Sequence, residues 1–180
     1  MDEPEYKLFR ATKTAFIILM GVGYLTRPKL VRGNYGVSNF WFKKRSRIPY
    51  VGGFAINALG TLLVASRLFG KGRPKLAASL AAKSALVASV LLTSKYLDTK
   101  LSKLHYGAGG AMYGAQVLIS GWLVLGKKSL KNLGLFGLEL AGTGLNLVSA
   151  MGKTQQMFVG QVLAQAGYLG ILLGILRPRR

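Results

Sequence analysis

The chain has 180 residues, of which 51% are hydrophobic, and its 25 Lys and Arg against five Asp and Glu give a formal charge of +20. The mean hydropathy of +0.34 is high for a soluble domain of this size, and the charges gather between long apolar runs, as in polytopic membrane proteins. The absence of cysteine excludes disulfides and cysteine-held metal clusters, and a single histidine argues against a histidine metal site within one chain.

Six apolar runs separated by short polar connections dominate the sequence. Each has the length of a membrane-crossing helix, provided that the first is extended back to residue 8 with Arg10 and Lys13 snorkelling toward the membrane surface. The predicted spans are residues 8–26, 48–69, 76–96, 106–126, 133–151 and 157–176. The sequence therefore predicts an all-α fold, one transmembrane domain over residues 1–180 with about six helices in a compact bundle.

The longest polar connection, residues 27–47, combines turn residues and aromatic residues with a basic cluster. Aromatic rings beside Lys and Arg are typical of the membrane interface, where cations meet lipid phosphates. We expect either a solvated loop with an aromatic anchor or a loop that binds lipid headgroups. The candidate headgroup contacts are Trp41, Lys43, Lys44, Arg45 and Arg47.

Glu139 and Lys83 are charged residues deep inside the fifth and third apolar runs. A charge at this depth is costly, so it normally faces a partner or a wet cavity. Each lies eight residues beyond a basic boundary residue, Lys131 or Lys75, which places both at about 12 Å along parallel helices. The favoured interpretation is that Lys83 and Glu139 form a buried pair. One alternative is a pathway for a proton or ligand. The other is that the two residues do not touch, with Lys83 snorkelling and Glu139 protonated.

Further polar side chains occur in the other spans. Gln161 and Gln165 share one face of the sixth helix, and such residues usually form hydrogen bonds between helices. Together they are also suited to lining a small polar cavity. The candidate intramembrane site comprises Lys83, Glu139, Asn57, Gln116, Asn146, Gln161 and Gln165.

Small residues recur at a spacing of four in three spans, as Gly110 and Gly114, Gly137 and Ala141, and Gly170 and Gly174. Such pairs allow close helix packing in lipid. We expect them to pack within the chain, and a homodimer face is the alternative.

The arrangement of spans, with Gly33–Asn39 in the first loop and Ile48-Pro49-Tyr50 opening the second span, resembles that of small six-helix integral membrane proteins, the DRAM-like proteins and bacterial membrane families of like topology. The resemblance rests on helix count and one loop, and it transfers no functional residues.

Two functions compete. The first is a membrane protein that binds or moves a lipid or small anionic solute, because charges lie inside the bundle. The second is a non-catalytic accessory subunit of a membrane complex, because the loops are short and small residues are many. A membrane enzyme ranks last, since it would depend on Glu139 or His105 alone; we expect no enzymatic activity, catalytic residue or cofactor.

The expected partners are membrane lipids of anionic character, with a homo-oligomer or other membrane subunits left open, and no nucleic acid, since no binding motif is present. A bacterial cytoplasmic membrane or an organellar inner membrane fits the composition. Slightly more Lys and Arg lie on the side of the termini, which favours termini on the cytoplasmic or matrix side.

Overall fold

The computed structural model describes residues 3–26, 36–152, 154 and 156–178. Its six α-helices are each long and apolar enough to cross a membrane, which confirms the predicted all-α bundle. The elements are α1 (Glu3–Thr26), η2 (Gly36–Phe42), α2 (Lys44–Gly70), α3 (Pro74–Thr93), η3 (Ser94–Tyr96), α4 (Ser102–Gly126), α5 (Leu130–Ala150) and α6 (Met157–Ile175).

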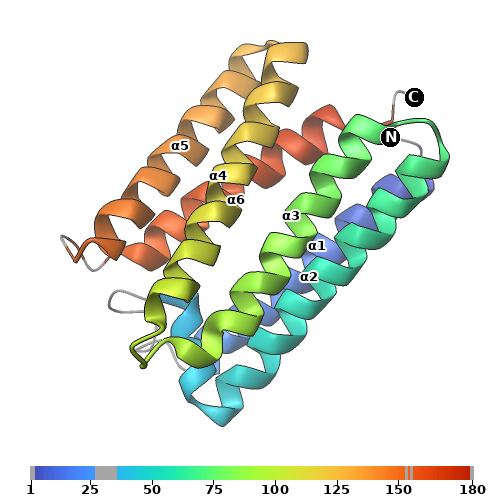
Figure 1. Cartoon of the computed structure of the whole chain (residues 1–180). Helices are drawn as coiled ribbons and strands as arrows, with labels where there is room; N and C mark the ends of the chain where they lie inside the picture. The colour runs from blue at the N-terminus through green and yellow to red at the C-terminus, as the bar shows by residue number, and fades with distance from the viewer. Residues whose placement is uncertain (1–2, 27–35, 153, 155, 179–180) are drawn as a thin grey trace.

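The helices form two groups, α1 to α3 and α4 to α6, which meet mainly where α3 packs on α4 (Figure 1). Helices α1, α2 and α3 pack side by side in chain order, α3 also contacts α4, and α5 packs most extensively on α6. Figure 1 shows α6 running obliquely behind α4, so that its later half approaches the start of α1. Helices α1 and α6 nevertheless contact each other only slightly.

Several helix boundaries differ from the prediction. Helix α1 begins at Glu3, five residues earlier than expected, and α2 begins at Lys44, which places Pro49 inside the helix rather than at its start. The predicted loop 27–47 is partly helical, because η2 occupies Gly36–Phe42, and residues 27–35 lie outside the described residues. Charged and polar first turns carry no apolar signal, which explains why the sequence placed these starts too late.

The turns between helices use the expected local chemistry. Gly72 adopts a positive φ of 68° between α2 and α3, a conformation that glycine tolerates best, and Pro74 follows at the first position of α3. Ser129 caps α5, since its side chain accepts a 3.1 Å hydrogen bond from the Asn132 backbone N–H. These short connections leave little of the described chain outside the six helices.

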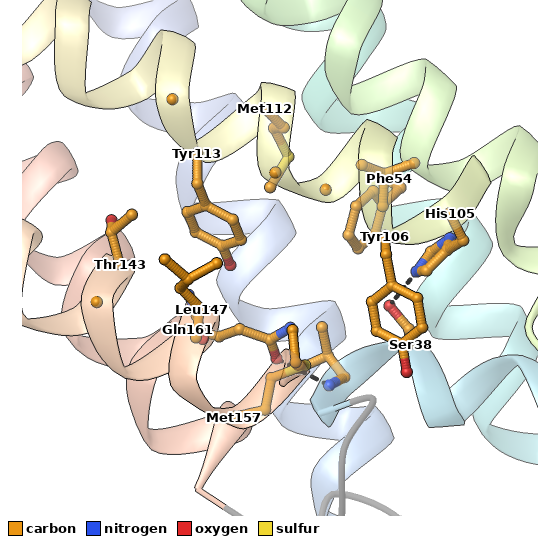
Figure 2. A pocket seen from close by; sticks show the side chains of 18 residues that line it. Ser38, Phe54, His105, Tyr106, Met112, Tyr113, Thr143, Leu147, Met157 and Gln161 are labelled. Atoms are coloured by element: carbon orange, nitrogen blue, oxygen red, sulfur yellow. Dashed lines mark hydrogen bonds between the residues drawn. The ribbon is translucent and has the colours of Figure 1, made fainter. Parts of the chain in front are cut away.

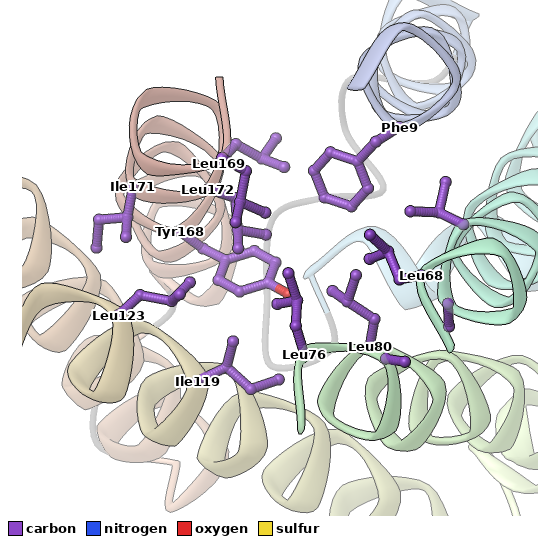
Figure 3. Packing of buried hydrophobic residues seen from close by; sticks show 14 of the residues in the cluster. Phe9, Leu68, Leu76, Leu80, Ile119, Leu123, Tyr168, Leu169, Ile171 and Leu172 are labelled. Atoms are coloured by element: carbon purple, nitrogen blue, oxygen red, sulfur yellow. The ribbon is translucent and has the colours of Figure 1, made fainter. Parts of the chain in front are cut away.

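One hydrophobic cluster fills the end of the bundle where α1 begins and α6 ends. Figure 3 shows the Tyr168 ring projecting from α6 between Leu76 of α3 and Leu123 of α4, with Phe9 of α1 nearby. Tyr168 is buried, although its hydroxyl has no hydrogen-bond partner among the described residues. The cluster therefore packs α6 against α1, α2, α3 and α4 at this end.

The close helix contact of the fold lies between α5 and α6, at glycines that the spacing motifs did not single out. A Cβ added to Gly142 would lie 2.3 Å from the Ala164 backbone nitrogen, and one added to Gly160 would lie 2.8 Å from the Gly142 carbonyl oxygen. Backbones this close require residues without side chains. By contrast, Gly110, Gly114, Gly137 and Gly174 have no atom within 4 Å of an added Cβ. The expectation that Gly110–Gly114 and Gly137–Ala141 pack within the chain is therefore wrong; of the glycines in these motifs, only Gly170 meets a neighbour, Leu135.

Gly36 lies where η2 is attached to α6, and we predict that Gly36→Ala weakens this attachment. Its φ is 54°, a region unfavourable for alanine, and an added Cβ would lie 2.2 Å from Gln161 Oε1. That oxygen accepts a 2.9 Å hydrogen bond from the Val37 backbone N–H. We expect a loss of about 1–2 kcal/mol in the free energy of unfolding, measured in mixed micelles. Gly21→Ala, where nothing lies within 4 Å, serves as control; equal stability of the two variants would contradict the prediction.

Candidate functional site

Lys83 lies at the centre of a polar network between α3, α4 and α6. Its side chain is buried, and Nζ donates 2.7 Å to Gln116 Oε1 and 3.2 Å to the Met112 carbonyl oxygen. Gln165 Nε2 donates 3.2 Å to the same Gln116 oxygen, and Gln116 Nε2 donates 3.2 Å to the Ala164 carbonyl oxygen. The ring of Tyr168 also faces the ammonium, 5.1 Å from its centroid. The structure thus brings together Lys83, Gln116 and Gln165 of the predicted polar residues, and the Gln116 side-chain oxygen accepts from the other two.

Lys13 is a second buried lysine, and the prediction that it snorkels to the membrane surface is wrong. Only 4% of the residue is exposed, and Nζ donates to Asn57 Oδ1 and, at 2.7 Å, to Thr61 Oγ1. Arg10, one turn earlier, is exposed. Phe9 and Phe16 flank Lys13 on the buried face of α1. The helical spacing of these apolar residues therefore indicates that Lys13 points inward, and the prediction failed because it relied on the charge of Lys13 instead.

Glu139 is fully buried on α5 but does not form the expected direct pair with Lys83. Neither carboxylate oxygen has a hydrogen-bond partner among the described residues, although Ser120, Lys83 and Gln116 lie close enough to act on it electrostatically. Lys83 donates to Gln116 instead. Glu139 is held by backbone packing, since a Cβ on Gly167 would lie 2.7 Å from its nitrogen. Lys83 and Glu139 are therefore near each other without a direct hydrogen bond or ion pair among the described residues.

The remaining predicted residues separate from this network. Gln161 holds η2 through the Val37 N–H, and Asn146 is buried on α5 with no partner for either amide atom among the described residues. Asn57 belongs to the Lys13 group. Buried polar groups normally have hydrogen-bond partners, so Asn146 and Glu139 are the two members of the predicted set whose environments call for an explanation.

The two buried lysines meet at one cavity, here called the lysine cavity, with a volume of about 370 Å³. Asn57, Gln165 and Tyr113 add polar groups to a wall that is otherwise mostly apolar, and α1, α2, α3, α4 and α6 all contribute to it. Lys13 and Lys83 also act on each other electrostatically. Tyr113 and Thr61 were not anticipated from the sequence, because isolated Tyr and Thr residues in an apolar span resemble ordinary packing residues.

A second cavity of about 330 Å³, here called the neutral cavity, lies between α4, α5, α6 and η2. Figure 2 shows Tyr113, Met112 and Phe54 among the side chains around it. These three, with Val37 and Gln161, also line the lysine cavity. The two cavities are therefore neighbours that share a wall.

The candidate headgroup contacts lie around the start of α2. Lys43, Lys44, Arg45 and Arg47 are exposed, and Trp41 is half-buried. The Arg47 guanidinium stacks over the Trp41 ring, 5.0 Å from its centroid, and its Nε donates to the Trp41 carbonyl oxygen. This arrangement keeps an aromatic ring and four cations together outside the apolar helix segments.

Comparisons of the chain with protein-family models, with curated proteins and with solved structures find no match. The resemblance to DRAM-like and similar six-helix membrane proteins remains a prediction. The function is therefore argued from the cavities and the residues that line them.

Proposed function

We propose that this multi-pass membrane protein binds or moves a lipid or small anionic solute through the lysine cavity, and that it does so without catalysing a reaction. The observation that carries the proposal is the placement of two buried lysine side chains, Lys13 and Lys83, in the wall of one mostly apolar cavity. Charged groups inside membrane-spanning segments usually mark a ligand or ion pathway.

The charges around the cavity favour an anion. In their protonated forms, Lys13 and Lys83 bring two positive charges to the cavity, and Glu139 is the acid that acts on Lys83. An ammonium group has three donors, and the described hydrogen bonds use two on each lysine. One donor on each side chain is therefore available to an acidic oxygen, and a single negative charge would balance the second lysine.

The position of the cavity favours a ligand that reaches it from the bilayer. Ile17 of α1 and Val162 of α6 line the cavity and are about half exposed, at 54% and 50%. They lie where α1 and α6 contact each other only slightly. Tyr24 and Phe158 stack face to face between the same two helices, with centroids 5.4 Å apart. An amphiphile would enter between α1 and α6, with its acidic end toward the lysines.

The test is binding of oleate, dioleoylphosphatidylglycerol and a neutral control, oleyl alcohol, to purified protein, measured by native mass spectrometry. We predict that Lys13→Met and Lys83→Met each weaken binding of an anionic ligand roughly ten- to hundredfold, the effect of losing a hydrogen bond from a charged donor. Methionine keeps the chain length and removes the charge. Arg10→Met, on the exposed face of α1, is the matched control and should bind like the unmodified chain. Unchanged anion binding by folded lysine variants would overturn the proposal.

The alternative function is an accessory subunit of a membrane complex. It is favoured by the outward face of α5, where Gly137 and Ala141 are exposed and Gly137 has no atom within 4 Å of an added Cβ. Small residues of this kind allow a partner helix to approach closely. A constant set of other subunits after gentle extraction, together with no anion binding by the isolated chain, would favour this function over the first.

A further inference from the structure

The neutral cavity differs from the lysine cavity in its charge. Among the described residues, no Lys, Arg, Asp or Glu lines it. Leu147 of α5 lies at its wall and is 63% exposed, so the cavity opens toward the outer surface of α4 and α5. Any ligand held there would come from the bilayer and carry no charge, because an ion would have no counter-charge at the wall.

Most polar groups at this cavity already have partners. The two ring nitrogens of His105 lie 3.0 Å from Ser38 Oγ and 3.2 Å from Thr93 Oγ1, and the first of these contacts is drawn in Figure 2. Gln161 accepts from the Val37 N–H. These side chains fix η2 against α4 and α6, and α3 against α4, and need no ligand.

Asn146 and Thr143 are the exceptions. They lie three residues apart on α5 and therefore on one face, and both line the cavity. Both amide atoms of Asn146 and the hydroxyl oxygen of Thr143 have no hydrogen-bond partner among the described residues, although the Tyr113 hydroxyl lies close enough to Asn146 to interact with it electrostatically. Asn146 is 8% exposed, and an amide left unpaired at that depth costs about 1–3 kcal/mol. A ligand that both donates and accepts a hydrogen bond would remove this cost.

Glycine shapes the facing walls of the cavity. Gly109, Gly110 and Gly114 of α4 and Gly144 of α5 line it, and an added Cβ at any of them would have no atom within 4 Å. At these positions the cavity wall consists of helix backbone, and the space next to it is open. Small residues let a neighbouring surface approach the helix backbone closely, so a rigid, flat molecule can lie against these walls.

We propose that the neutral cavity binds a flat, uncharged alcohol of the sterol type, with its hydroxyl at Asn146. A hydroxyl donates to the amide oxygen and accepts from the amide nitrogen, so it satisfies both atoms. A ketone accepts only and leaves the amide oxygen unpaired, and a carboxylate would bring a charge into a neutral wall. On binding, the Asn146 amide turns from its covered position toward the ligand, and the ring system lies along the glycine surfaces.

The experiment compares two ligands on the unmodified chain. A photoreactive cholesterol analogue is cross-linked to protein in phosphatidylcholine nanodiscs, and cholesterol and its 3-ketone, cholestenone, compete for labelling. We expect cholesterol to compete about tenfold better, and the labelled peptides to come from α4 and α5. Equal competition by the two sterols, or labelling elsewhere on the chain, would overturn the proposal without the need for any variant.

Two variants on one helix separate the cavity from the outer surface. Gly109→Leu fills the cavity and should reduce specific labelling of the protein by the sterol analogue at least tenfold. Gly107 lies on the same helix but does not line the cavity, so Gly107→Leu should be labelled as strongly as the unmodified chain. Asn146→Leu should bind both sterols alike. Labelling by cholesterol that survives Gly109→Leu would contradict the proposal. Lys13 and its partners Asn57 and Thr61 do not line this cavity, so Lys13→Met should weaken anion binding and leave sterol binding unchanged, and the two proposals can fail independently.

Discussion

Replacing Gln116 by leucine is expected to lower the free energy of unfolding by about 3 kcal/mol. Leucine has a similar size, but it removes the oxygen that accepts from both Lys83 and Gln165. The buried ammonium would then keep the Met112 carbonyl as its described acceptor. Leaving a buried charged donor short of partners costs more than an ordinary hydrogen bond is worth. The measurement is equilibrium unfolding in mixed detergent micelles, followed by circular dichroism.

A second substitution tests whether Lys83 is the cause. In the Gln116→Leu/Lys83→Met chain both partners are apolar, and such paired replacements are often nearly neutral. We therefore expect the double variant to be more stable than Gln116→Leu alone, with an interaction energy of about 1–3 kcal/mol. Additive effects of the two changes would show that Gln116 stabilises the bundle through packing and not through the lysine.

The sequence was sufficient for the fold because apolar run length is a strong signal. Six runs of hydrocarbon length predicted six helices, and the structure has them. The starts of α1 and α2 were missed because Glu3 to Lys7 and Lys44 to Arg47 are polar helix turns. Nothing in their composition separates them from a loop, and only the continuous hydrogen-bonded backbone does so.

The sequence predicted which residues belong to the candidate site, but not which of them contact one another. Lys83, Gln116 and Gln165 were chosen as polar groups in apolar spans, and the structure joins them. The direct Lys83–Glu139 pair rested on equal depth along two helices. Equal depth gives no lateral position. Helix α6 holds Gln116 of α4 through the Ala164 carbonyl and packs the Gly167 backbone against Glu139. Lys13 was missed for a different reason: its charge was taken to decide its direction, whereas its neighbours on α1 did.

The second large effect is expected at the α5–α6 contact, where the addition of one methyl group should destabilise the protein. A Cβ at Gly142 would lie 2.3 Å from the Ala164 nitrogen and 2.6 Å from the Gly160 carbonyl oxygen. Both are backbone atoms, so no side chain can rotate away, and α6 itself must move. We expect Gly142→Ala to lower the free energy of unfolding by about 3 kcal/mol, the upper part of the range for overpacking.

A glycine-to-alanine substitution on the open face of α5 should instead raise the free energy of unfolding. Gly137 has no atom within 4 Å of an added Cβ, and alanine is favoured over glycine within a helix by about 1 kcal/mol. Gly137→Ala should therefore raise stability in the same micelle unfolding assay, and a loss at both positions would show that α5 has a partner on its outer face. Because α6 carries Gln161 and Gln165, its displacement in Gly142→Ala should also weaken anion binding at the lysine cavity, although the substituted residue lies outside that cavity's wall.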